Sequence, residues 1–331
     1  MRVMIFDVTR HKFSEAILTL LFFAAAATMG AMWLFPVSDT ILGGAEAPLA
    51  GYIAEFQQTY PALSALLLGL LYIYMVVVLS RSTVRVAMYP VTTLSAFGVT
   101  SVLLFGTLSS GSYLPLAVCA LFVVEAFSRL MHCSRPSLQA HYLFSAMVAL
   151  GALPLFDKSF VALVLILPIF VLIIRATLRE TVLTILGLLI PTFIYCYVVW
   201  LLGGDFGDSF MAVWCENFVS SHLSLAEYLT IPRLVYLGVV MFMQLLTSVL
   251  YFATPLSLGT GAREVWRVLQ FAMVVLLVSL LAVPAASPAL VVAMTLLSAT
   301  MIPLLLQYAS AINSVLAYLI LILVTFAPLL A

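Results

Sequence analysis

Apolar runs of about 20 residues recur along the whole chain, and each is almost free of charged side chains. A helix of about 20 apolar residues is long enough to cross the hydrocarbon core of a bilayer. Charged residues make up 8% and hydrophobic residues 65% of this chain, whereas a soluble domain carries about 25% charged residues. Alternating segments of about ten residues, which a membrane β-barrel would require, do not occur. The sequence therefore predicts an all-α, polytopic transmembrane helical bundle.

Eleven segments fit such spans, and we expect one integral-membrane domain over residues 1–331. Turn-forming residues separate several of the segments, among them Gly111 and Pro284. Two longer, more polar segments, 37–60 and 203–232, are predicted to lie on the outer face and to be partly helical. The predicted spans cover about residues 15–35, 62–80, 88–107, 113–131, 142–156, 159–175, 181–202, 233–254, 267–284, 288–305 and 312–330.

Basic residues are distributed unevenly between the two ends of these spans. With the N-terminus in the cytoplasm, eleven of the thirteen Lys and Arg residues lie inside, and only Lys158 and Arg233 lie outside. Membrane proteins are enriched in positive charge on the cytoplasmic side, so this threading is favoured. The odd number of spans then places the C-terminus outside. Trp33, Trp200 and Trp214 fall at the outer interface, where tryptophan is enriched.

Three pairs of arginines recur at the predicted inner ends of helices, and the two members of each pair are four residues apart. That spacing places both guanidinium groups on one helix face. They could bind an anionic group such as a lipid phosphate, because guanidinium forks match phosphate geometry. The favoured alternative is that they fix the topology and touch anionic headgroups. The pairs are Arg81 with Arg85, Arg175 with Arg179, and Arg263 with Arg267.

Acidic residues predominate in the outer segments, and four of them are candidate functional residues. Asp39 follows the first span closely and could act as a general base, or could hold a divalent cation together with Asp205 or Asp208. Glu216 lies in the same segment as these two and could belong to a lid. The favoured alternative is that these acids are solvated, with Asp205 and Asp208 serving as turn residues beside glycines.

Few ionisable residues fall inside the predicted spans, which argues against ion-coupled transport. Glu125 lies one helical turn from Arg129, so a structural ion pair is expected there. Gln244 is polar but does not titrate, and a hydrogen bond between helices is its ordinary use. The four cysteines form no CxxC or Cys/His pattern, so no metal site is expected. The chain also lacks the basic patch typical of nucleic-acid binding.

The layout resembles that of the GT-C glycosyltransferases, which move a sugar from a polyprenyl-phosphate carrier at the outer face. The shared features are a cytoplasmic N-terminus, about eleven spans, an acid after the first helix and outer segments after the first and seventh spans. The resemblance implies that Asp39 is the catalytic base. The chain departs from the family in its short first outer segment, its lack of a paired-acid motif and its few outer basic residues.

A second resemblance is local. The run from Arg175 to Pro191, followed by an aromatic-rich helix, is similar to uncharacterised multi-pass inner-membrane proteins of Bacteroidota. It implies a location in the bacterial inner membrane and brings no catalytic residues with it.

Three functions follow from these patterns. The favoured one is a non-catalytic, accessory subunit of an envelope-biogenesis or secretion complex, with the lipid bilayer and other membrane proteins as partners. The second is a GT-C-like glycosyltransferase. No cofactor is expected, and a divalent cation is possible only under this alternative. The third is a small-molecule transporter.

Overall fold

The computed structural model describes residues 13–34, 47–90, 95–133, 139–175, 177–214, 229–253, 258–282 and 286–330. This part of the chain forms thirteen α-helices and two short 3-10 helices, without a β-strand. The elements are α1 (Phe13–Trp33), α2 (Ala50–Thr59), α3 (Pro61–Arg85), α4 (Ser95–Leu108), α5 (Tyr113–His132), α6 (Gln139–Phe156), η2 (Lys158–Phe160), α7 (Val161–Arg175), α8 (Leu178–Leu201), α9 (Phe206–Trp214), α11 (Ile231–Ala253), α12 (Thr260–Ala282), α13 (Pro288–Tyr308), α14 (Ala311–Thr325) and η4 (Ala327–Leu330).

The predicted helical class is confirmed, and each of the eleven predicted spans contains a helix in the expected order. Within the described residues, eight helices are long and apolar enough to cross a membrane: α1, α3, α5, α8, α11, α12, α13 and α14. The helices α4, α6 and α7 are apolar but shorter. The protein is therefore a multi-helix protein suited to a bilayer.

Three predicted boundaries are wrong by five residues or more. Helix α3 continues to Arg85 where its span was expected to end at residue 80, and α12 begins at Thr260 where its span was expected to begin at residue 267. The span expected from residue 88 begins as α4 only at Ser95, and residues 86–90 form a turn. The backbone N–H groups of Ala87 and Met88 donate to carbonyls of the last turn of α3 at 3.1 Å, which ends that helix after Arg85. Helices often end at a glycine, but no glycine directly follows α3 in the sequence. The apolar residues after Arg85 therefore gave no indication that the helix ends there.

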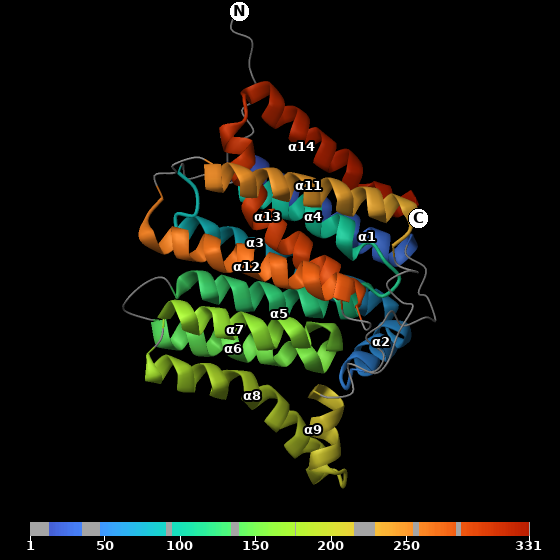
Figure 1. The fold of residues 1–331 in the computed structure, drawn as a ribbon. Helices are drawn as coiled ribbons and strands as arrows, with labels where there is room; N and C mark the ends of the chain where they lie inside the picture. Colours follow the sequence, from blue (N-terminus) through green and yellow to red (C-terminus); the bar gives the residue numbers. More distant parts are fainter. Residues whose placement is uncertain are drawn as a thin grey trace, which may run out of the picture.

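The helices lie side by side and alternate in direction, so their ends gather at two opposite sides of the bundle (Figure 1). Helix α13 is central, because it packs on α4, α5, α11, α12 and α14 and is buried from Pro288 to Leu304. Helix α8 is peripheral, since it packs on α6, α7 and α9 and most of its surface stays exposed. The main hydrophobic core extends from Leu20 in α1 to Leu321 in α14.

One side of the bundle carries the arginine pairs, and we call it the arginine end. It comprises the ends of α3, α5 and α7 and the beginnings of α8 and α12, at the left of Figure 1. The other side, which we call the opposite end, carries α2 and α9 (Figure 1). These two helices belong to the segments 37–60 and 203–232, so the prediction that both segments are partly helical is confirmed.

A buried glutamine attaches α2 to the bundle. Gln57 is 3% exposed, its Nε2 donates to the carbonyl of Gly111, and its Oε1 accepts from the backbone N–H of Leu114 at 3.0 Å. The amide thus satisfies two backbone groups at the turn between α4 and α5. Helix α2 is thereby fixed to the bundle at this turn.

Candidate functional site

The arginine pairs lie where the sequence places them, at one end of the bundle. Arg81 and Arg85 (the α3 pair) occupy the last two turns of α3 and are exposed. Arg263 and Arg267 (the α12 pair) lie near the beginning of α12 and are also exposed. Exposed guanidinium groups at helix ends are positioned to meet lipid headgroups.

The structure brings two of these pairs onto neighbouring elements. Trp266 of α12 is fully buried, and its indole Nε1 donates to the carbonyl of Met88 at 3.0 Å. Met88 follows the end of α3 by three residues, so the beginning of α12 is bonded to the chain just after the α3 pair. Arg179 is exposed in the first turn of α8, and Arg175 ends α7.

At the opposite end, Asp205 serves as a helix cap. Its Oδ1 accepts from the backbone N–H groups of Gly207 at 2.6 Å and Asp208 at 3.1 Å, at the beginning of α9. Asp205 thus stabilises the beginning of α9 next to Gly204 and Gly207. Asp208 is exposed in the first turn of α9. Asp39 and Glu216 lie outside the described residues.

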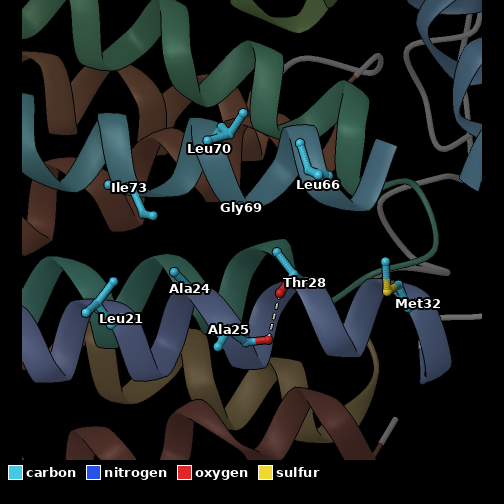
Figure 2. Close-up of a pocket in the computed structure, with 9 residues that line it drawn as sticks. All are labelled: Leu21, Ala24, Ala25, Thr28, Met32, Leu66, Gly69, Leu70 and Ile73. Carbon is cyan, nitrogen blue, oxygen red and sulfur yellow. Dashed lines mark hydrogen bonds between the residues drawn. The ribbon is translucent and has the colours of Figure 1, made fainter. Parts of the chain in front are cut away.

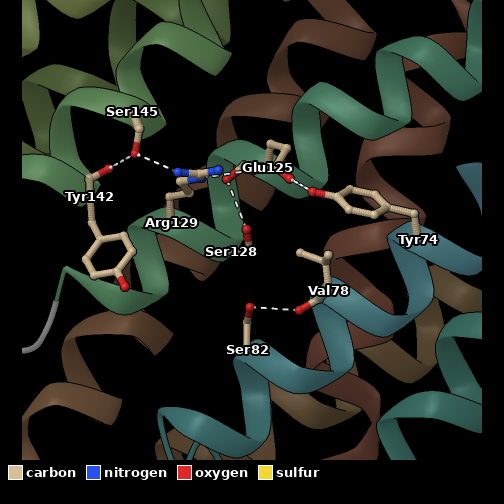
Figure 3. A network of polar contacts seen from close by, with 8 residues as sticks. All are labelled: Tyr74, Val78, Ser82, Glu125, Ser128, Arg129, Tyr142 and Ser145. Carbon is tan, nitrogen blue, oxygen red and sulfur yellow. Dashed lines mark hydrogen bonds and ion pairs between the residues drawn. The ribbon is translucent and has the colours of Figure 1, made fainter.

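A charged cluster joins α3, α5 and α6 toward the arginine end (Figure 3). Glu125 accepts from Arg129 Nε at 2.9 Å, as expected from their spacing, and from the hydroxyl of Tyr74. Arg129 also donates from Nη1 to Ser145 Oγ at 3.3 Å. Glu125 therefore binds a side chain of α3, and Arg129 binds a side chain of α6. We call these four residues the Glu125 cluster.

The Glu125 cluster fits a structural role. Its arginine side chain is 37% exposed and its glutamate 19% exposed, so the pair lies at a lateral boundary of the bundle and not in a central cavity. Charges inside a membrane protein are costly unless they are paired and hydrogen-bonded. Here the carboxylate has two donors and the guanidinium has two acceptors.

Asp157 forms a second polar cluster that sequence reasoning missed. Asp157 lies between the predicted spans 142–156 and 159–175, and the structure buries it to 4% exposure between η2 and the beginning of α13. Its Oδ1 accepts from the backbone N–H and the hydroxyl of Ser159 at 2.9 and 2.6 Å, and its Oδ2 accepts from Ser287 Oγ at 2.6 Å.

Burial raises the pKa of the Asp157 carboxyl, and the hydrogen bonds from Ser159 and Ser287 oppose that rise in part. Ser287 also caps α13, because its Oγ accepts from the backbone N–H of Ala289 at 3.2 Å. Two local capping patterns, Asp157 before Ser159 and Ser287 before Pro288, are visible in the sequence. Neither reveals that the two caps bind each other.

The remaining candidate is an apolar groove between α1 and α3, with a cavity volume of about 420 Å³ (Figure 2). Leu21, Leu66 and Leu70 line it and are half exposed, so the groove opens at the side of the bundle where acyl chains would lie. Its floor is a close helix contact, because a Cβ added at Gly69 would lie 2.4 Å from Thr28 Cγ2. The lining offers almost no polar group and therefore suits a hydrocarbon chain.

Metal chemistry gains no support from the described residues, among which no three His, Cys, Asp or Glu side chains gather as ligands. Comparison with known proteins adds no assignment: no family model matches the chain, and no curated protein or solved structure matches it significantly.

Proposed function

We propose that this protein is a multi-pass protein of the bacterial inner membrane that serves as an accessory, non-catalytic subunit of an envelope-biogenesis or secretion complex. In this proposal the chain crosses the membrane eleven times, with its N-terminus and the arginine end in the cytoplasm and its C-terminus outside. The clustering of arginines at one end supports the orientation, since positive charge marks the cytoplasmic side.

The observation that carries the proposal is the exposed apolar face of α8 and α9, on the side that points away from the bundle. Thr184, Gly187 and Cys196 face the bundle and are buried, whereas the other side of α8 exposes large apolar side chains along its length. Within the hydrocarbon core of the bilayer, lipid acyl chains can cover such an apolar face. The exposed apolar residues continue beyond it, with Leu202 83% and Met211 55% exposed. Apolar side chains past the end of a span favour a protein as their cover.

The acidic residues beside this face indicate which charge a partner would carry. Asp205 and Asp208 lie exposed beside this apolar face, and the only Lys or Arg of the segment from Gly203 to Arg233 is Arg233 itself. The matching partner is a membrane protein whose apolar transmembrane helix covers α8 and whose outer end carries Lys or Arg.

Site-specific photo-crosslinking in native membranes tests the docking face. A photoreactive residue at Ile194 of α8 and one at Met211 of α9 should both attach to one and the same protein. The matched control is Phe242 of α11, which is equally apolar and 61% exposed and should give no such adduct. Asp208→Lys should weaken the adduct from Met211. Equal adducts from all three positions, or none from Ile194, would contradict the proposal.

A GT-C-like glycosyltransferase is the second candidate, and the groove between α1 and α3 favours it. A polyprenyl-phosphate sugar needs an apolar surface for its chain, and this groove leads along α1 toward the segment that carries Asp39. Under this alternative Asp39 is the general base, Asp205 and Asp208 are candidate cation ligands, and segment 203–232 covers the site. An Asp39→Asn variant that keeps full biological function would exclude it.

A further inference from the structure

The end of α3 and the beginning of α12 form one structural unit at the arginine end. The bond from Trp266 Nε1 to the Met88 carbonyl joins them, and Tyr89 donates its hydroxyl to the Thr300 carbonyl of α13 at 2.6 Å. Trp266 also stacks on Tyr251 of α11, with ring centroids 4.9 Å apart and planes 14° apart. The arginines on these elements therefore sit on a rigid base.

The α3 pair and the α12 pair share this base, and both are exposed. Each pair has the four-residue spacing that aims two guanidinium groups from one helix face. A guanidinium fork binds phosphate oxygens with two parallel hydrogen bonds, so each pair suits one phosphate. Glu264 is the acid within this stretch of α12, which leaves positive charge in excess.

Two further features of the site suit a lipid. The ring of Tyr251 and the 73% exposed ring of Phe252 lie at the end of α11, where aromatic side chains meet the boundary between acyl chains and headgroups. Helix α12 begins at Thr260 at the same end, so the positive end of its dipole adds to the arginine charges.

We propose that the α3 pair and the α12 pair form one site for an anionic phospholipid with two phosphates, one phosphate for each pair. The lipid lies in the leaflet at the arginine end, with an acyl chain against Tyr251 and Phe252. Arg179 on α8 stands apart from this site, because α8 packs on α6, α7 and α9. The site is independent of the function proposed above.

Binding to the purified, delipidated full-length protein tests this proposal, by native mass spectrometry and by the shift of the thermal unfolding midpoint. The added probes are cardiolipin, phosphatidylglycerol, phosphatidylcholine and inorganic phosphate. We expect cardiolipin to bind at least about tenfold more tightly than phosphatidylglycerol, and phosphatidylcholine to bind weakest. Equal binding of cardiolipin and phosphatidylglycerol would overturn the two-phosphate site. Stabilisation by inorganic phosphate alone would identify a free anion instead of a lipid as the ligand.

Charge-removing variants locate the site. The double variant R263Q/R267Q and the single variant R81Q should each weaken cardiolipin binding, by roughly tenfold or more for the double variant. R179Q is the matched control: it removes an exposed arginine at the same end and should change binding less than about twofold. The variant R263K/R267K keeps the positive charge but loses the guanidinium fork. Its affinity for cardiolipin should lie between those of the wild type and R263Q/R267Q. An R179Q loss equal to that of R81Q would show a diffuse basic surface and refute the site.

Folding of the variants is checked by their unfolding midpoint without lipid. If one site is formed, the combined loss in R81Q/R263Q/R267Q should differ from the product of the separate losses, because contacting groups are not additive. Strict additivity of the losses would contradict a shared ligand.

Discussion

Ser287 Oγ donates a hydrogen bond of 2.6 Å to Asp157 Oδ2, although 130 residues of chain separate the two. The bond links the cap of η2 to the cap of α13, the most buried of the eight helices long enough to cross a membrane. Asp157 is 4% exposed, so its charge is held by these hydroxyl and amide donors in place of water. The two turns at the opposite end are thereby tied to each other.

The Asp157 carboxyl predicts a pH dependence of stability. Burial raises the pKa of this group in the folded protein above the ordinary value of about 3.9. The folded state then binds the proton more tightly than the unfolded state. Stability is greatest below the unfolded pKa and falls as pH rises through the window between the unfolded and the folded pKa.

Thermal unfolding in detergent across this acidic window measures the effect. Asp157→Asn keeps the cap and removes the titration, so its unfolding midpoint should lack this part of the pH dependence. A wild-type midpoint that rises with pH where the variant stays flat would show that the sign is wrong.

Ser287→Ala tests the link between the turns. It removes a donor from a buried carboxylate together with the cap of α13, and we expect a loss of about 1–3 kcal/mol in unfolding free energy. Ser310→Ala is the matched control, because Ser310 caps α14 at an exposed position and accepts from the Asn313 N–H at 3.3 Å without touching a carboxylate. Equal losses in the two variants would mean that the bond to Asp157 contributes nothing.

Gly151→Ala should separate α6 from α8. A Cβ at this position would lie 2.2 Å from the backbone carbonyl oxygen of Leu188, and Gly187 makes the reciprocal close approach to α6. Small residues at such contacts let membrane helices approach closely. We expect a loss of about 1–3 kcal/mol, since backbone must shift to relieve the overlap. Gly238→Ala in α11 meets nothing within 4 Å and should leave the unfolding midpoint unchanged or slightly raised.

Local patterns in the sequence predicted the features that depend on nearby residues. The apolar runs located a helix in each expected span, and the four-residue spacing predicted the Glu125–Arg129 ion pair. In each case the residues that interact are within a few positions of each other. Periodicity and turn chemistry suffice for such features.

Features that depend on distant residues were not predictable in this way. The burial of Asp157 requires Ser287, and the hydrogen bond from Tyr74 to Glu125 crosses from α3 to α5. The α3 and α12 arginines lie on neighbouring elements because Trp266 donates a hydrogen bond to Met88, 178 residues away in the chain. A single sequence does not specify which helices become neighbours, so the composition of these sites emerges only from the fold.

Ala87 occupies a backbone position that favours glycine. It follows α3 with a φ of 52°, in a motif in which its N–H donates to Val84 and the N–H of Met88 donates to Thr83. The left-handed conformation costs a residue with a Cβ about 1 kcal/mol or more, and glycine avoids that cost. Ala87→Gly should therefore raise the unfolding midpoint.

The control for Ala87 is Ala27→Gly, within α1, where glycine should lower the midpoint because it weakens a helix interior. A lowered midpoint in both variants would show that the entropy of the unfolded chain outweighs the strain at Ala87.

The Glu125 cluster predicts an asymmetry between removing one charge and removing both. Arg129→Met leaves the Glu125 carboxylate with the Tyr74 hydroxyl as its remaining side-chain donor, whereas Glu125→Gln with Arg129→Met removes both charges. An unpaired charge in a low-dielectric setting costs more than the loss of the pair itself. We expect the single Arg129→Met variant to have a lower unfolding midpoint than the double variant. A double variant that is the less stable of the two would indicate that the ion pair itself stabilises the contacts of α5 with α3 and α6.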